Sequence, residues 1–548
     1  MTLGRVINRI KKNEFLYSFL GIAFFVSIFN YEAVLGLDVL LLDDNARFSS
    51  AIRGVTFNDY WLNFGWITAL IKALNLKLML IGITFARVFY LVVFVIPLSM
   101  SIFYFNRKLL NFDSVPAFIS AIIINILPLQ LHVPKFLDGS GFVIGMLFLF
   151  LSLIFALKYL KTKNLLNLAL SGFLWHTANQ SLGELGVIMF PALILLFVLY
   201  ESPFKNKLII LAVYVPIVLY KFYRIISFDR GAAGKAVLQT FDTVIYRAKK
   251  AVEWGSVFNL KNDFTLYATG FLLFCFVVGF LFALYKRKGT SQRQEYLHFL
   301  FYFLFGLLSI APFILLTKYF STRYFYTSFA AFWILTILSV YYILLNVIKR
   351  KLIVFMLLIC LIIFSGVHRH LNQIKENRGF NNRNATICGA IQELEEIKPD
   401  GQVVITGIAN GTGEYYMWSM GYIDHCLQRG DVVGLIGNEY SFYDPFNTNH
   451  RGYAYKMEGL DIEKPIYVVK RMGAEITNNP KYYLRWFDSK DKKSDWIVYT
   501  RNSQTAILNE YYSGSGFDNY LNEAGERSIA TSDIFWGNYL SKYTKKGF

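Results

Sequence analysis

The 548-residue chain is 55% hydrophobic, 18% aromatic and only 17% charged. Soluble proteins are usually about one quarter charged, so this composition excludes an ordinary soluble protein and indicates a membrane protein. The formal net charge of +18 would suit a nucleic-acid partner. From position 368 onward, however, there are 21 basic against 22 acidic residues, which leaves 34 against 15 before that position. The basic excess therefore accompanies the apolar segments, and a nucleic-acid-binding domain is excluded.

About eleven apolar runs approach the roughly 20 residues that a membrane-spanning helix needs. In chain order they are centred near residues 26, 92, 122, 150, 171, 192, 213, 275, 306, 335 and 359. The first run follows the basic residues Arg5, Arg9, Lys11 and Lys12 and has no small-residue cleavage site, so we expect a retained signal anchor. The sequence thus predicts a polytopic α-helical membrane domain over residues 1–367.

Basic residues predict the orientation of these spans. With a cytoplasmic N-terminus, every second short loop is basic, as the positive-inside rule requires. These inner loops contain Arg107 and Lys108; Lys158, Lys161 and Lys163; Lys205 and Lys207; Lys286, Arg287, Lys288 and Arg293; and Lys349, Arg350 and Lys351. An odd number of spans then places residues 368–548 outside the membrane.

Two predicted outer segments are long. Residues 38–77 begin polar and become aromatic and amphipathic, which favours helices lying in the membrane interface. Residues 221–265 are rich in Lys and Arg although they lie on the outer side. This loop is suited to close over a phosphate headgroup, or equally to adhere to anionic lipids.

Residues 368–548 are polar and contain short β-prone runs at 402–406, 465–469 and 495–499, preceded by a predicted helix at 384–397. We expect a soluble, extracytoplasmic α/β or α+β domain. Cys388 and Cys426 lie in this region and would form a disulfide in an oxidising compartment; two isolated buried thiols are the alternative. The four cysteines of the chain show no zinc-ligand spacing.

An acidic pair, Asp43 and Asp44, follows the first span on the predicted outer side. One carboxylate is suited to act as a general base, and the pair can also hold a divalent metal such as Mg or Mn, although no cofactor is required. The alternative is a solvated loop with a helix N-cap, where Asp is favoured.

Further polar groups lie at the predicted outer ends of later spans. His176, with Asn179, Gln180 and Glu184, interrupts the fifth and sixth spans and suits either sugar hydroxyls or hydrogen bonds between helices. Lys221 and Arg224 end the seventh span. The glycine-rich segment 407–413 lacks the spacing of nucleotide-binding loops, so no nucleotide-sugar site is predicted.

A span, an outer loop opening with an acidic pair, and many further spans resemble the GT-C superfamily of membrane glycosyltransferases. The segment Leu42-Asp43-Asp44-Asn45-Ala46-Arg47-Phe48 is similar to the start of O-antigen glucosyltransferases of the GtrII type and of the mannosyl- and aminoarabinosyltransferase group. Arg323 and Tyr324 resemble a GT-C element that contacts the carrier-lipid phosphate; an aromatic and basic interfacial belt is the alternative.

The resemblance implies an enzyme in the inner (cytoplasmic) membrane of a bacterium that takes a sugar from a polyprenyl-phosphate donor. The acceptor would be a cell-envelope glycan such as O-antigen or lipopolysaccharide, a glycolipid or a protein, and hexosyl transfer would be inverting. Asp43 or Asp44 would be the base, and Arg47, Arg323, Tyr324, Lys221 and Arg224, with His176 and Glu184, would bind the substrate. The alternatives are a transporter or flippase of lipid-linked saccharides, or an O-antigen polymerase or ligase.

Overall fold

A computed structural model describes residues 13–37, 66–126, 141–182, 202–227, 240–255, 299–310 and 326–397, and the strand segments 402–406, 434–436, 466–471, 482–488, 493–499 and 506–507. The chain forms two compact units. The first comprises Met1–Leu35, Phe57–Ala73 and Thr84–Ile374. The second comprises Gly36–Thr56, Leu74–Ile83 and Lys375–Phe548. Asp43, Asp44, Arg47, Glu184, Arg323 and Tyr324 lie outside the described residues.

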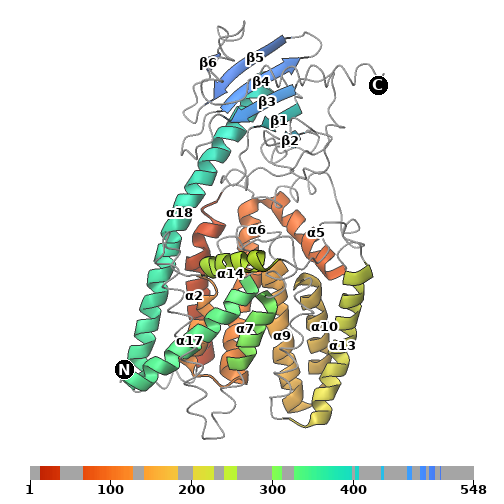
Figure 1. Cartoon of the computed structure of the whole chain (residues 1–548), viewed down its shortest axis with the longest axis vertical. Helices are drawn as coiled ribbons and strands as arrows, with labels where there is room; N and C mark the ends of the chain where they lie inside the picture. Colours follow the sequence, from red (N-terminus) through yellow and green to blue (C-terminus); the bar gives the residue numbers. More distant parts are fainter. Residues whose placement is uncertain are drawn as a thin grey trace. The chain divides into compact units, whose positions relative to one another are not determined.

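The first unit is a helical bundle (Figure 1). Its helices are α2 (Glu14–Val34), α6 (Ile83–Tyr90), α7 (Ile96–Tyr104), α8 (Ser114–Ile123), α9 (Gly141–Thr162), α10 (Leu165–Leu182), α13 (Phe204–Ser227), α14 (Phe241–Gly255), Phe299–Ile310 and α17 (Tyr326–Ile348). It also contains the start of α18 (Lys351–Ile397), whereas α5 (Trp66–Ile81) is shared by the two units.

Five helical segments are long and apolar enough to cross a membrane: Glu14–Val34, Ile83–Leu109, Gly141–Thr162, Tyr326–Ile348 and Lys351–Lys375. A polytopic helical membrane protein is therefore confirmed in outline. The count of eleven spans stays a prediction, because the runs centred near residues 192 and 275 lie outside the described residues.

The segment Ile83–Leu109 contains two π-helical stretches, η1 (Leu91–Val95) and η2 (Phe105–Leu109), which flank α7. A π turn holds one residue more than an α turn, so it accommodates an extra residue without turning the helix on either side of it. Buried side chains therefore stay on one side of this segment from Arg87 to Leu109.

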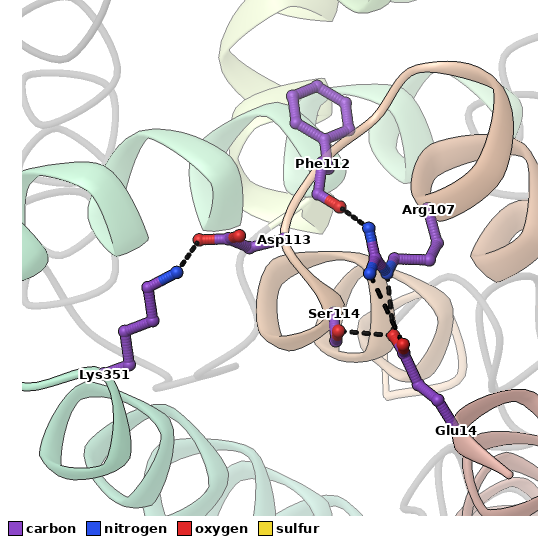
Figure 2. Close-up of polar contacts among 6 residues, drawn as sticks. All are labelled: Glu14, Arg107, Phe112, Asp113, Ser114 and Lys351. Carbon is purple, nitrogen blue, oxygen red and sulfur yellow. Dashed lines mark hydrogen bonds and ion pairs between the residues drawn. The ribbon is translucent and has the colours of Figure 1, made fainter. Parts of the chain in front are cut away.

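Polar contacts hold several helix ends together at one end of the bundle (Figure 2). Arg107 Nε donates to Glu14 Oε1 at 2.7 Å, and Ser114 Oγ donates to the same carboxylate. Lys351 Nζ lies 2.9 Å from Asp113 Oδ2, to which Tyr341 also donates. The start of α2, the end of η2 and the starts of α8 and α18 thus meet here.

Lys158 near the end of α9 lies over the ring of Tyr104, so the basic residues around Lys163 belong to this same end. We call it the basic end of the bundle. Arg107, Lys158 and Lys351 come from three of the five predicted inner loops, and the structure gathers these three residues at a single end, as a common side of the membrane requires.

The opposite end of the bundle contains the start of α6, the start of α17 and the part of α18 that follows Gly366. Phe29 of α2 packs on Gly366, where an added Cβ atom would overlap the ring. The glycine therefore permits close approach of two membrane helices.

The second unit contains a mixed sheet in the order β2-β1-β3-β4-β5-β6. Its strands are β1 (Gln402–Thr406), β2 (Gly434–Ile436), β3 (Ile466–Arg471), β4 (Tyr482–Asp488), β5 (Lys493–Tyr499) and β6 (Ala506–Ile507). β1 pairs in parallel with β2 and β3, and the remaining pairs are antiparallel. The three predicted strand runs correspond to β1, β3 and β5.

The helix predicted at 384–397 is the end of α18, which is 47 residues long and continues from the last span without a break. Cys388 on this helix is disulfide-bonded. Its partner cysteine lies outside the described residues, so the pairing with Cys426 stays a prediction. The extracytoplasmic location of this region is likewise still a prediction.

Candidate functional site

The buried stripe of α18 changes character along its length. Val354, Leu358 and Ile362 are buried at helical spacing, as expected for an apolar span. The next buried positions on this face are Ser365 and then Arg369 and Gln373. A stripe that packs against the bundle thus becomes polar at the end opposite the basic end, where packing alone would favour apolar side chains.

Arg369 is the central residue of this polar stretch. Its side chain is buried, with 5% of the residue exposed, and none of its three guanidinium nitrogens has a hydrogen-bond partner among the described residues. Burying a charge without a partner costs several kcal/mol, about 3–5 kcal/mol when one member of a buried pair is removed. A site of this kind is built for a negatively charged partner.

One tyrosine lies beside this guanidinium, and a second tyrosine lies beside the first. Tyr326 begins α17 and interacts electrostatically with Arg369 and with Tyr90, the last residue of α6. Both phenol hydroxyls are buried and have no hydrogen-bond partner among the described residues. Because the cost of burying a hydroxyl is usually offset by a hydrogen bond, these two groups are available to a ligand.

Gln373 lies one turn beyond Arg369 on α18. Its side-chain oxygen and nitrogen are both buried and both lack partners within the described part of the chain. We call Tyr90, Tyr326, Arg369 and Gln373 the Arg369 cluster. It draws its members from α6, α17 and α18, three helices that are far apart in the sequence and meet at the end opposite the basic end.

A second guanidinium enters the same end of the bundle. Arg87 lies one turn before Tyr90 on α6 and is fully buried. An arginine inside a span either snorkels to the membrane surface or interacts with a group within the protein, and the burial of Arg87 rules out snorkelling.

The chemistry that the Arg369 cluster offers is that of an anion site. A guanidinium presents five N–H donors in a plane, and two phenol hydroxyls and a carboxamide add three further donor groups. Phosphate and carboxylate oxygens match this set, and a guanidinium can bind either of them through two parallel hydrogen bonds.

The Arg369 cluster is not among the sites predicted from the sequence, because Arg369 falls within the predicted outer domain, 368–548. The signal was present: Arg369 falls seven residues after Ile362, so it continues the buried stripe of the span. Tyr326 and Tyr90 gave no signal, because aromatic residues near span ends are common.

Of the predicted substrate-binding residues, Lys221 and Arg224 belong to the last turns of α13, and their side chains are not among those described. His176 lies half-buried on α10. Its neighbour Asn179 is buried and donates to the Trp175 carbonyl oxygen at 2.9 Å, within the same helix.

The polar residues of α10 also contribute to helix packing. Tyr214 of α13 lies 2.6 Å from the hydroxyls of both Ser152 on α9 and Ser171 on α10. Its ring stacks on Trp175 with centroids 4.6 Å apart. Hydrogen bonds between helices, the structural alternative for this region, therefore join α9, α10 and α13, at positions one or more turns before His176.

Among the described residues, no group of three or more His, Cys, Asp or Glu side chains is arranged to hold a metal ion. Asp43 and Asp44, the predicted metal ligands, lie outside that part of the chain. No protein-family model matches the sequence, and no curated protein matches it either.

Proposed function

We propose that the protein is a membrane glycosyltransferase that moves a sugar from a polyprenyl-phosphate donor to an envelope glycan, glycolipid or protein. The observation that carries the proposal is the buried guanidinium of Arg369 beside Tyr326, both without a hydrogen-bond partner among the described residues. A phosphate group attached to a membrane lipid supplies the negative charge that this arrangement lacks, and it reaches the cluster from within the bilayer.

In the proposed reaction the acceptor oxygen forms a bond to the anomeric carbon of the sugar while the bond from that carbon to the phosphate oxygen breaks. The electron pair stays on the phosphate, and the acceptor proton passes to Asp43 or Asp44. Arg369 would stabilise the negative charge that develops on the leaving phosphate, which is the largest single contribution in many enzymes. A single displacement of this kind inverts the configuration at the anomeric carbon of the sugar.

The membrane location supports the same function. The basic residues lie at one end of the bundle and the Arg369 cluster lies at the other, so the positive-inside rule assigns the cluster to the outer face. With a bacterial inner membrane, this is the face on which lipid-linked sugars are used for the cell envelope. The region 368–548, which we predict to be extracytoplasmic, would then help to select the acceptor.

The test is a transfer assay with purified protein in nanodiscs, a polyprenyl-phosphate hexose and an envelope-glycan extract, read by mass spectrometry. We expect transfer by the wild type, and loss of at least 100-fold in Arg369→Gln and in at least one of Asp43→Asn and Asp44→Asn. Arg350→Gln, an exposed position at the basic end, is the matched control.

Full transfer activity in the Arg369→Gln variant would show that the Arg369 cluster takes no part in the reaction. If the donor binds but no sugar moves, and reconstituted vesicles instead show the lipid crossing the bilayer, then the protein is a transporter of lipid-linked saccharides and the glycosyltransferase proposal fails.

A further inference from the structure

Helix α14 differs from the spans of the first unit. It lies crosswise to the upright helices α9 and α13, near their upper ends in Figure 1. Its sequence Phe241–Gly255 is amphipathic and carries five charged residues, so it is neither apolar enough to cross a bilayer nor uniformly polar.

Phe241 and Ile245 lie one turn apart on the apolar face of α14, and Tyr246 lies on the adjoining side of the helix. Phe241 is 77% exposed and Tyr246 is 58% exposed, and Ile245, one turn after Phe241, is exposed as well. Arg247 is only 6% exposed and so turns toward the bundle. This arrangement is the reverse of that in a soluble protein, where the aromatic residues would be inside and the arginine outside.

We propose that α14 lies in the interface of the lipid bilayer, parallel to its surface, with Phe241 and Ile245 inserted at the boundary between headgroups and acyl chains. Three observations indicate that a lipid bilayer covers the exposed side of α14. The helix has low overall hydrophobicity with one strongly apolar face, which is the pattern of interfacial helices. It lies across the spans, and its exposed side carries Phe and Tyr, which favour the interface.

The membrane-spanning helices of the first unit also require a bilayer around them. α2 exposes Leu16, Leu20 and Phe24 in one row along its span. Such a row requires hydrocarbon around it. The proposal extends that lipid contact from the sides of the bundle to one helix lying at its surface, and it stands whether or not the protein transfers sugars.

The experiment places an environment-sensitive fluorophore on single cysteines in nanodiscs. With the predicted Cys388–Cys426 pairing, the background carries Ala at Cys275 and at Cys360, which is a free, exposed thiol, and keeps the disulfide-bonded Cys388 and Cys426. The test variants are Phe241→Cys and Ile245→Cys. Asp242→Cys is the matched control, because Asp242 is the exposed charged neighbour on the same turn.

We expect the labels at positions 241 and 245 to be quenched by lipids brominated near the headgroup, at least threefold more than the label at position 242. The label at 242 should instead be quenched by aqueous iodide. Equal iodide quenching at all three positions would overturn the proposal in favour of a helix in water. Quenching mainly by lipids brominated near the chain ends would overturn it in favour of deep insertion. Labels reached by neither quencher would show a protein contact.

Discussion

The burial of Arg369 lowers the stability of the ligand-free protein. Its guanidinium is buried between helices, and within the described part of the chain the hydroxyls and the carboxamide of the Arg369 cluster also lack hydrogen-bond partners. Proteins tolerate local instability of this kind where function requires it, so stability and function should respond in opposite directions to a change at this residue.

At Arg369 the substitution to Met is the informative one. Met retains the length and most of the volume of the stem but removes the buried charge, so Arg369→Met should stabilise the ligand-free protein by about 1–3 kcal/mol. Thermal unfolding in detergent should show a higher midpoint, while sugar transfer is lost. Arg350→Met, at an exposed position, should change neither quantity. A lower midpoint for Arg369→Met would mean that the guanidinium has a stabilising partner.

At the scale of elements, the close packing of α2 on α18 depends on Gly366. A Cβ atom at this position would overlap the ring of Phe29, which is itself buried. Gly366→Ala should therefore destabilise the protein by about 1–3 kcal/mol, the usual cost of overpacking. The double variant Phe29→Leu/Gly366→Ala should recover part of this loss, measured as a coupling in a double-mutant cycle. Additive effects would show that the two helices separate freely.

The π-helical stretch η1 leads to a different kind of prediction. Val93 in η1 is exposed, and deleting it should turn the stretch into ordinary α-helix without turning either flank. Deleting the exposed Val88 of α6 instead should turn residues 83–87 by about 100°, because an α-helix has 3.6 residues per turn. We expect the first deletion to keep transfer and the midpoint of unfolding, and the second to lose both. Equal losses of transfer activity and of the unfolding midpoint in the two deletion variants would contradict this interpretation of η1.

For the whole molecule, the distribution of charge predicts which end faces the cytoplasm. Lys163 at the basic end and Thr240 before α14 are both exposed. In the background with Ala at Cys275 and Cys360, a membrane-impermeant maleimide should label Thr240→Cys in intact cells, and Lys163→Cys only after the membrane is permeabilised. The reverse pattern would invert the topology and place the Arg369 cluster on the cytoplasmic side.

Much of this architecture could be predicted from residue patterns. The apolar runs marked the spans because a bilayer demands continuous apolar helices, and β1, β3 and β5 stood out as short β-prone runs. The Arg369 cluster could not be assembled in this way. Its members come from three separate helices, and only tertiary packing decides that Tyr326 lies beside Arg369. Likewise, η1 has no composition that distinguishes it from the α-helix around it.

One consequence of the way α18 is exposed concerns how a ligand arrives. Val367 and Leu371, two positions to either side of Arg369, are exposed apolar residues. They lie on the side of α18 that faces away from the bundle. A lipid-linked ligand would therefore approach by diffusion within the plane of the leaflet and would not pass through water. Occupancy of the cluster would then follow the mole fraction of that lipid in the membrane, and diluting the vesicles in buffer would leave it unchanged.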